Sequence, residues 1–279
     1  GASYKEIRNT FEKNKMIHQI PLLDENDQVI DLILLDEIFN VKEKENYVIL
    51  MAGGLGTRLR PLTDDTPKPM LTVGNKPILE LIINQFKEYG YKNILISVNY
   101  KREIIESYFG DGSDYGVNIE YLRENKRLGT AGALKLAQDK LNDKPFFVMN
   151  GDVLTQVDFS SFIKFHQINN FDLTMGTKKY EYEFPYGVVN MNGAQVKDLE
   201  EKPKNHYFIN AGIYCLSPEM IDYIPYNKYF DITDVINLAL KDNKKIGSFP
   251  IREYWLDIGQ KEDYYKAQDD YKNKLKNNL

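Results

Sequence analysis

The sequence predicts an α/β fold, with a Rossmann-like, mainly parallel sheet flanked by helices. The first observation is that short apolar runs alternate with segments of helical periodicity between residues 47 and 169, which is typical of βαβ units. The second is a change after residue 173, where short alternating runs separated by turns predict an antiparallel addition to the sheet. The third is a separate N-terminal pattern of helix, strand, turn and strand. We therefore expect one large domain with a small appendage.

Composition and charge narrow the classes of protein. The 279 residues are 42% hydrophobic and 28% charged, which is ordinary for a globular protein with a substantial core. The net charge of −5 and the pI of about 5.4 argue against nucleic acid or an anionic membrane as the main partner. Cys215 is the only cysteine, so no intrachain disulfide can form and we expect a cytoplasmic protein. We find no signal peptide and no apolar run long enough to span a bilayer.

Residues 1–46 form the predicted appendage and linker. Residues 4–15 predict a polar helix, residues 18–23 and 29–35 predict two strands joined by a turn, and the charged residues 41–46 predict a linker. An apolar strand pair of this size would expose a hydrophobic patch if it stood alone, so we expect it to pack on the main domain or on a second copy of the chain. The chain begins with Gly-Ala-Ser and no Met, like the remnant of a tag, and we expect the natural protein to begin further upstream.

Residues 47–279 form the predicted main domain, which opens with a glycine-rich loop. The apolar run at residues 47–51 predicts a strand buried on both faces. Gly53, Gly54 and Gly56 follow, and they allow dihedral angles that side chains forbid. Backbone N–H groups can then turn inward and close on a phosphate.

Basic residues follow these glycines. Arg58 and Arg60 add positive charge beside the loop, and Lys68 lies between two prolines that stiffen its position, so the set favours a clamp for a triphosphate. It is not a Walker A loop, because no glycine is followed by Lys and Ser or Thr, and it is not a dinucleotide fingerprint, because Leu59 stands in place of the third glycine. A tight turn with incidental arginines is the alternative, and Lys68 speaks against it.

Helices and strands alternate through the rest of the domain. Helices are expected where apolar residues recur at helical spacing, at residues 77–89, 102–109, 159–169 and 232–240 and from residue 260 onward. Strands are expected at residues 93–98, 117–122, 145–150 and 245–250, with shorter antiparallel strands at residues 173–178, 186–190, 195–200 and 207–216. Residues 128–134 predict a glycine-containing turn into a helix whose N-terminus could also face a ligand.

Polar residues cluster where the predicted parallel strands end. In sheets of this type, ligands bind beyond the carboxyl ends of the strands, where Asn99 and Asn150 are expected. Asp152 lies one glycine beyond a buried strand and opposite the phosphate loop, which makes it a candidate magnesium ligand, with a helix N-cap or a turn as the alternative. Asp257, two residues after the only tryptophan, is a second isolated carboxylate.

The motifs of the main domain occur in a fixed order from residue 47 to about residue 270: AGGLGTRLRPLT, TPKPM, GTAGAL, NGD, YGVV, EEKP, NAGIY and WLDIG. This ordered set is similar to the sugar-1-phosphate nucleotidyltransferase family. The resemblance implies a parallel sheet with an inserted sugar-binding region. It also implies a reaction in which a nucleoside triphosphate and a sugar 1-phosphate are joined and pyrophosphate is released, with Mg²⁺ as the cofactor. Such a reaction needs no covalent side-chain intermediate, so we expect His18, His166 and His206 to be bystanders.

The resemblance also implies roles for individual residues. Arg58, Lys68 and Asp152 are the expected catalytic residues, and Asp152 and Asp257 are expected to share the magnesium ion. The expected nucleotide-binding residues are Leu50, Ala52, Gly53, Gly54, Gly56, Thr57, Arg58, Asn99, Gly129, Thr130, Ala131, Asn150 and Gly151. The expected sugar-phosphate-binding residues are Gly187, Glu201, Lys202, Asn210, Ala211 and Gly212. Strand register decides between Glu200 and Glu201, and we choose Glu201 because it directly precedes Lys202.

A second resemblance lies in the N-terminal segment, where IPLLDENDQVIDLILLDEI resembles the second half of a CBS motif. Such motifs normally work in pairs that often bind adenosine nucleotides and tune an attached enzyme. The resemblance implies a regulatory module whose other half lies upstream or in another chain of a homo-oligomer; a purely structural hairpin is the alternative. A CBS half ahead of such a domain resembles the glucosamine-1-phosphate guanylyltransferases of nonulosonate (legionaminic acid) synthesis.

We therefore expect GTP and glucosamine 1-phosphate as substrates. Other bases or sugars are alternatives, as in mannose-1-phosphate guanylyltransferases and in glucose-1-phosphate cytidylyl- or thymidylyltransferases. A nucleotide-sensing regulatory protein without turnover is an alternative of another class, and the intact set of basic and acidic site residues speaks against it. A dinucleotide-dependent oxidoreductase is disfavoured by Leu59.

Overall fold

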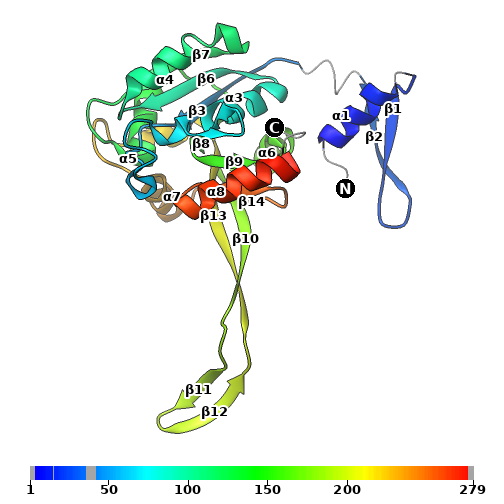
Figure 1. Cartoon of the computed structure of the whole chain (residues 1–279), viewed down its shortest axis with the longest axis vertical. Helices are drawn as coiled ribbons and strands as arrows, with labels where there is room; N and C mark the ends of the chain where they lie inside the picture. Colours follow the sequence, from blue (N-terminus) through cyan, green and yellow to red (C-terminus); the bar gives the residue numbers. More distant parts are fainter. Residues whose placement is uncertain (1–3, 15, 36–41, 276–279) are drawn as a thin grey trace.

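A computed structural model describes residues 4–14, 16–35 and 42–275 (Figure 1). Its main sheet has seven strands in the order β14-β10-β13-β8-β3-β6-β7. Parallel pairing joins β8 (Phe146–Asn150), β3 (Lys44–Met51), β6 (Tyr91–Val98) and β7 (Asn118–Arg123). Another parallel pair joins β10 (Leu173–Glu183) and β14 (Ile246–Pro250), and β13 (Lys204–Leu216) runs antiparallel to β10 and β8. The predicted mainly parallel sheet with an antiparallel addition is confirmed.

Alternate side chains of the buried strands point into two cores on opposite faces of this sheet. In β3, Val48 and Leu50 belong to one core and Ile49 to the other. The first core is covered by the helices α3 (Ile78–Glu88), α4 (Arg102–Phe109) and α6 (Phe159–Ile168). The second is covered by α5 (Gly129–Gly132), by the turns that follow it, and by α7 (Ile232–Lys241). Burial on both faces explains why these strands are continuous apolar runs in the sequence.

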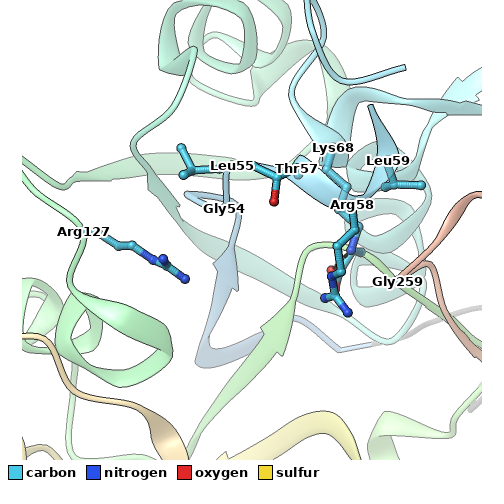
Figure 2. Close-up of a pocket in the computed structure, with 10 residues that line it drawn as sticks. Gly54, Leu55, Thr57, Arg58, Leu59, Lys68, Arg127 and Gly259 are labelled. Atoms are coloured by element: carbon cyan, nitrogen blue, oxygen red, sulfur yellow. Dashed lines mark hydrogen bonds and ion pairs between the residues drawn. The ribbon is translucent and has the colours of Figure 1, made fainter. Parts of the chain in front are cut away.

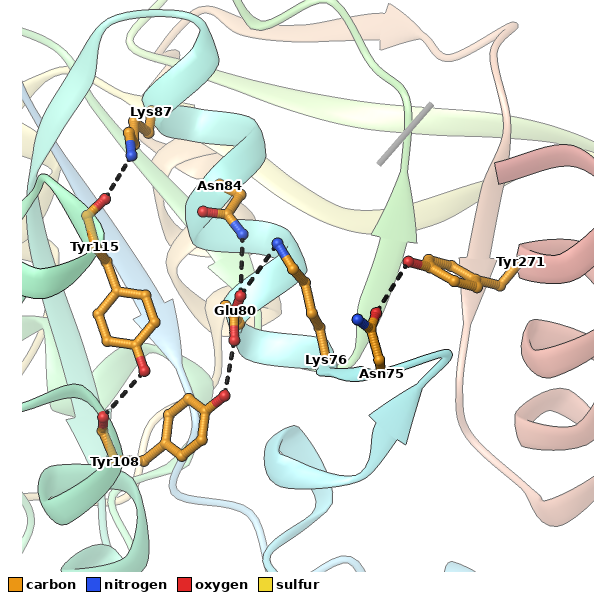
Figure 3. A network of polar contacts seen from close by, with 8 residues as sticks. All are labelled: Asn75, Lys76, Glu80, Asn84, Lys87, Tyr108, Tyr115 and Tyr271. Carbon is orange, nitrogen blue, oxygen red and sulfur yellow. Dashed lines mark hydrogen bonds and ion pairs between the residues drawn. The ribbon is translucent and has the colours of Figure 1, made fainter. Parts of the chain in front are cut away.

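A buried carboxylate ties α3 to its neighbours. Glu80 is only 8% exposed, and it accepts hydrogen bonds from the Tyr108 hydroxyl at 2.8 Å and from Asn84 Nδ2 at 3.4 Å (Figure 3). Lys76 Nζ lies 3.2 Å from Glu80 Oε1 and compensates its charge. The Tyr115 hydroxyl donates in turn to the Tyr108 carbonyl at 3.1 Å. These contacts fix α3 against α4.

The C-terminal helix packs beside a small two-stranded sheet. This sheet is formed by β4 (Thr72–Val73) and β5 (Lys76–Pro77), and α8 (Lys261–Asp270) is followed by a π-helical turn at Tyr271–Leu275. The Tyr271 ring covers Gly74, where an added Cβ would lie 2.1 Å from a ring carbon. Its hydroxyl donates to Asn75 Oδ1 at 3.4 Å (Figure 3). Gly74 is thus needed for this close approach.

Several short elements, among them β4, β5, β9 (Val153–Thr155) and β15 (Trp255–Asp257), were not predicted from the sequence, and the start of β3 also differs. The strand β3 begins at Lys44, whose amide donates to the Gly90 carbonyl at 2.8 Å, so part of the predicted linker belongs to the sheet. Val41 of that linker lies outside the described residues. Of the unpredicted strands, β9 pairs with β15. A three-residue strand has too few positions to show an alternating pattern, and only its distant partner reveals it.

The N-terminal residues form a small unit of their own. The helix α1 (Tyr4–Lys13) packs Ile7 and Phe11 on one face of the hairpin formed by β1 (Gln19–Leu23) and β2 (Val29–Leu34). The opposite face exposes apolar side chains, among them Ile30, Leu32 and Leu34. Its expected packing partner stays a prediction, and residues 36–38 of the CBS-like stretch lie outside the described residues. None of the helices in the described ranges has the length and hydropathy of a membrane span.

The most unusual feature is a long ribbon that leaves the sheet (Figure 1). We call residues 177–210 the arm. It contains the outer parts of β10 and β13, and it ends in a hairpin formed by β11 (Val188–Asn192) and β12 (Gln195–Glu200). The sequence predicted these strands but not the unbroken pairing of β10 with β13 from Thr177 to Glu183.

Candidate functional site

The glycine-rich loop leaves β3 at the carboxyl edge of the sheet. The Ala52 amide still donates to the Ser97 carbonyl of β6 at 2.9 Å, and the loop then turns away. An added Cβ at Gly53 would lie 2.5 Å from Glu124 Oε1, so only glycine lets the loop pass this carboxylate. Gly56 adopts the left-handed conformation with a φ of 64°, and its carbonyl accepts a hydrogen bond of 2.8 Å from the Thr63 hydroxyl. The loop is therefore held in one shape.

This loop lines a pocket of about 240 Å³ (Figure 2). Backbone amides from Gly53 to Arg58 meet no acceptor among the residues that the structure describes. Figure 2 shows the Arg58 and Arg127 side chains on opposite sides of the pocket, and both line it. Unpaired amides with flanking guanidinium groups are suited to a polyphosphate. The geometry thus agrees with the triphosphate clamp predicted from the sequence, and we call residues 53–58 with the adjoining Lys68 and Arg127 the cradle.

Lys68 reaches the pocket from a neighbouring short helix. This 3-10 helix, Lys68–Met70, begins after Pro67 and contains Pro69, which restricts the backbone. The Lys68 side chain is mostly buried, and its ammonium group pairs with Asp152 Oδ2. Burial of this lysine beside its partner fixes the position of a positive charge at the base of the pocket.

Asp152 and Asp257 lie together at the end of this ion pair. The Ile258 amide donates to the Asp152 carbonyl at 3.0 Å, which anchors the two segments to each other. Asp152 Oδ1 is buried and has no hydrogen-bond partner among the described residues. The Asp257 side chain is exposed and lines the second pocket described below. Desolvation and the neighbouring Asp152 raise the pKa of Asp257, although Lys68 and Arg58 oppose this shift.

These two carboxylates fit a divalent cation. An unpartnered buried carboxylate oxygen beside a second carboxylate is a good environment for Mg²⁺, which binds oxygen and usually keeps several ligands from water or phosphate. No cluster of three or more His, Cys, Asp or Glu side chains with metal-binding geometry occurs within the described residues. Any ion held here would thus take its remaining ligands from water and from a bound substrate.

A second pocket of about 280 Å³ adjoins the first and extends toward β7. It is lined by predicted residues, among them Gly53, Gly129, Thr130 and Asn150, together with four that the sequence did not indicate: Glu124, Arg127, Tyr229 and Asp231. Glu124 is only 7% exposed, and its carboxylate accepts hydrogen bonds from Ser97 Oγ at 2.7 Å and from the Leu128 amide at 2.9 Å. No spacing signal marks these four residues, because strand order and the approach of α7 bring them to the pocket.

Three amides of the predicted helix N-terminus after Leu128 are already paired within the protein. The Thr130 amide donates to Asp231 Oδ1 at 2.9 Å, and the Ala131 and Gly132 amides donate to the Phe230 carbonyl, each at 2.9 Å. The segment before α7 therefore uses the donors that were expected to bind an anion. Gly129 and Thr130 nevertheless line the second pocket, so a ligand contact by this turn stays a prediction. The sequence did not show that residues 230–231 pack on the turn.

Some predicted nucleotide-binding residues contribute no side chain to the pockets. Leu50, Ala52 and Ala131 are fully buried in the two cores. Gly151 packs against the backbone, where an added Cβ would lie 2.8 Å from the Met51 carbonyl oxygen. Asn99 lies beside Gly53, with 3.3 Å between its Cβ and the Cβ position of that glycine. These residues shape the loop from behind, whereas Gly54, Gly56, Thr57 and Arg58 line the pocket itself.

The predicted sugar-phosphate residues fall into two groups. Asn210, Ala211 and Gly212 lie at the base of the arm; an added Cβ at Gly212 would lie 2.7 Å from Asn150 Nδ2, and the Ala211 carbonyl accepts a bond of 2.8 Å from the Trp255 indole. Asn210 Nδ2 donates to the Tyr214 hydroxyl at 2.7 Å.

The second group is remote from the pockets. Gly187, Glu201 and Lys202 lie far out on the arm, where an added Cβ at Gly187 would be 3.0 Å from Glu201 Oε2. Gly187 and Glu201 thus lie close to each other, and none of the three residues lines either pocket.

Residues 47–274 match the Nucleotidyl transferase family model. Among curated proteins, the chain is 38% identical over 223 residues to mannose-1-phosphate guanyltransferase of Yarrowia lipolytica, a match that covers 77% of this chain and 61% of that protein. It is 37% identical over 235 residues to mannose-1-phosphate guanyltransferase of Saccharomyces cerevisiae, covering 81% of this chain and 65% of that protein. The chain thus spans less than two thirds of the length of these relatives.

A solved structure with a similar fold is HddC from Yersinia pseudotuberculosis. It superposes with a TM-score of 0.65 and 30% sequence identity, and the match covers 81% of this chain and 99% of that chain. A second structure of HddC, complexed with GMP-PN, superposes with the same TM-score.

Proposed function

Since the chain belongs to the nucleotidyl transferase family, we propose that it joins a nucleoside triphosphate to a sugar 1-phosphate and releases pyrophosphate. The observation that carries the proposal is the pocket in which free loop amides, Arg58 and Lys68 converge beside two carboxylates. This arrangement has the donors that a triphosphate needs and the acidic pair that a divalent cation needs.

The reaction requires alignment and charge neutralisation more than a chemical group from the protein. An oxygen of the sugar phosphate attacks the α-phosphorus, the bond to the β-phosphate oxygen breaks, and pyrophosphate leaves. The loop amides and Arg58 hold the β- and γ-phosphates, which become the leaving group. Lys68 lies where negative charge grows on the α-phosphate, and its pairing with Asp152 keeps it in place.

Asp152 and Asp257 would hold Mg²⁺. When bound, the ion would neutralise the phosphate oxygens and orient them for in-line displacement. Arg127 extends into the cradle from the side opposite Arg58, so we assign it a further contact to the triphosphate. The residues of the pocket would exclude water and keep the sugar phosphate in line with the α-phosphate.

For the base we propose guanine. The names of the curated relatives and the GMP-PN complex of HddC support this choice. The buried Glu124 carboxylate, which lines the second pocket, supports it independently. A carboxylate has about four acceptor positions, and Ser97 and Leu128 occupy two of them. Guanine presents two neighbouring donors, N1–H and N2–H, whereas uracil and thymine present one donor between two acceptors.

For the sugar we propose mannose 1-phosphate ahead of glucosamine 1-phosphate. The curated relatives are mannose-1-phosphate guanyltransferases, and this supports an alternative that the sequence left open better than it supports the glucosamine expectation. Glucosamine 1-phosphate rests on the N-terminal CBS-like resemblance alone. It therefore remains the second candidate, to be compared directly.

The experiment is a matrix of substrates. The purified chain with Mg²⁺ is offered each common nucleoside triphosphate with mannose, glucose or glucosamine 1-phosphate, and pyrophosphate release is measured. We expect the highest kcat/KM for GTP with mannose 1-phosphate. Nucleotide binding without pyrophosphate from any pair would instead support a sensing protein and overturn the proposal.

A Glu124→Gln variant tests the choice of base. The amide keeps the size of the side chain but replaces one acceptor by a donor, so the preference for GTP over UTP should fall about tenfold. Unchanged discrimination would remove Glu124 from base recognition, without affecting the assignment of the phosphate cradle.

A further inference from the structure

The backbone is strained at Lys101, which lies between β6 and α4. This residue has a φ of 50° and a ψ of 38°, in the left-handed region. Most of the other non-glycine residues with a positive φ in the described ranges are Asp or Asn, whose short polar side chains tolerate this conformation better than lysine does. Strain of this kind persists only where the surrounding contacts compensate it. The contacts of Lys101 therefore show what the strain maintains.

The Lys101 side chain reaches the segment that follows the cradle in the sequence. Its ammonium group donates to the Asp64 carbonyl and lies 3.6 Å from Asp65 Oδ1. The Tyr100 hydroxyl donates to the same carbonyl at 3.4 Å, and the Lys101 ammonium lies 5.5 Å from the centre of the Tyr100 ring. The Lys101 side chain is only 22% exposed, so its apolar stem is covered as well. We call Tyr100, Lys101 and the Asp64 carbonyl the anchor.

The anchor is connected to the cradle through the residue before Asp64. That residue, Thr63, is 1% exposed, and its hydroxyl donates to the Gly56 carbonyl at 2.8 Å. An added Cβ at Gly56 would lie 3.0 Å from the Thr63 methyl group, so the two residues also pack closely. Gly56 is the N-cap of the 3-10 helix that carries Arg58. The position of Asp64 thus determines, through Thr63 and Gly56, where the Arg58 backbone lies.

The same end of β6 also holds the beginning of the cradle loop. The Ala52 amide donates to the Ser97 carbonyl at 2.9 Å, and Asn99 Cβ lies 3.3 Å from the position of a Cβ added at Gly53. Residues 97–101 therefore contact the loop both where it begins and where it ends. Helix capping does not explain the lysine, because the Lys101 side chain makes no capping hydrogen bond to α4. Its contact with Asp64 does.

We propose that Lys101 is a positioning residue, which holds the loop from Gly53 to Arg58 in the conformation that binds the triphosphate. Lys101 lines neither of the two pockets, so it acts through the loop rather than on the ligand. A loop fixed at both ends has less conformational freedom to lose when a ligand binds, and this raises the affinity. Without the anchor, that ordering must take place on binding. The role in triphosphate binding rests on the proposed function, whereas the anchoring of the loop does not.

Variants of Lys101 separate positioning from stability. Lys101→Gly removes both the ammonium group and the strain, so its melting temperature should stay within about 3 °C of the wild-type value or rise. Its dissociation constant for GTP with Mg²⁺, measured by calorimetry, should nevertheless rise about tenfold. Lys101→Arg restores a donor and should bind within about threefold of wild type. Lys87→Met is the matched control, because it removes a lysine that donates to a carbonyl outside the loop, that of Tyr115 at 2.6 Å, and it should leave GTP affinity unchanged.

A second measurement keeps the test independent of the nucleotide. The amides of Leu59, Leu62 and Asp64 are hydrogen-bonded within the loop, and in the free Lys101→Gly chain they should exchange with solvent about tenfold faster than in wild type. Unchanged GTP affinity of Lys101→Gly, or an equal loss in Lys87→Met, overturns the proposal. If the wild-type chain neither binds GTP nor releases pyrophosphate, the proposed function fails, and hydrogen exchange alone decides the anchor. Equal exchange rates in the wild-type and Lys101→Gly chains would then overturn it.

Discussion

The cradle and the arm differ in how firmly the surrounding protein holds their residues. The cradle relies on backbone and buried charge: Gly53 passes within contact distance of Glu124, and Lys68 is fixed to Asp152. The arm is a two-stranded ribbon whose side chains are largely exposed on both faces. A phosphate can be held by rigid amides and fixed cations, whereas a variable sugar suits side chains on a peripheral element. The difference suggests that nucleotide binding and sugar recognition can be damaged separately.

The largest effect is expected from Asp152→Asn in the cradle. This change removes the charge that pairs with Lys68 and one of the two carboxylates for the cation, so kcat should fall about 10³-fold. Pyrophosphate release in the presence of Mg²⁺ measures it. Asp64→Asn changes an exposed carboxylate outside the pocket and should keep nearly full activity. A small loss for Asp152→Asn would remove this carboxylate from the reaction.

Next in size is the effect of a methyl group in the loop. Gly53→Ala places a Cβ 2.5 Å from the buried Glu124 carboxylate and should reduce the free energy of unfolding by about 2 kcal/mol. Gly54→Ala is the matched control, because no heavy atom of the protein lies within 4 Å of the added Cβ. Urea unfolding of both variants gives the comparison. Equal stability of the two would show that the loop yields easily and that the cradle is not rigid.

A smaller effect is expected from the arm. Glu201→Ala should raise KM for the sugar 1-phosphate about tenfold and leave KM for GTP unchanged, because Glu201 is expected to contact only the sugar phosphate. The melting temperature should not move, since Glu201 is exposed. Steady-state kinetics with each substrate varied in turn separates the two constants. An equal rise in both KM values would mean that arm and cradle are not distinct sites.

The smallest effect concerns acid stability of the body that supports the cradle. Burial lowers the pKa of His166 to about 4, and its ring nitrogens contact the Thr174 and Ser217 hydroxyls at 2.9 Å and 3.3 Å. Below the unfolded pKa near 6.5 the unfolded chain binds a proton that the folded chain does not. His166 should therefore cost about 1 kcal/mol of stability between roughly pH 7 and pH 5.5.

His166→Gln removes this titration and keeps a polar side chain of similar length. Its free energy of unfolding should accordingly fall less over that pH range than that of the wild-type chain. Urea titrations at both pH values measure the difference. Parallel losses in the two proteins would show that other groups cause the acid sensitivity.

Much of the body could be predicted from the sequence because its strands are buried on both faces. A continuous apolar run, as at residues 93–98, or apolar residues at helical spacing, as at residues 77–89, can be recognised without knowing which segments pack against it. The loop from Gly53 to Arg58 was also identified, since glycines and basic residues adjacent in sequence remain adjacent in the fold.

What the sequence concealed depends on contacts between distant segments. Glu124 and Asp231 reach the second pocket only through strand order and through the packing of the turn before α7. Polar residues at Lys44 and Glu45 hid the start of β3, because half-buried strand ends carry no apolar signal. The length of the arm depended on the register between β10 and β13, which no local pattern determines.

The separation of cradle from arm is tested most directly by removing the outer arm. A chain in which residues 184–203 are replaced by an Asn-Gly turn ends its ladder at the Glu183 and Lys204 pair and closes as an ordinary hairpin. We predict that this chain binds GTP with a dissociation constant within about twofold of the wild-type value, because the cradle is intact, and that it releases no pyrophosphate with mannose 1-phosphate. Retained pyrophosphate release, or loss of GTP binding by the folded shortened chain, would contradict the assignment of nucleotide binding to the cradle and of sugar-phosphate binding to the arm.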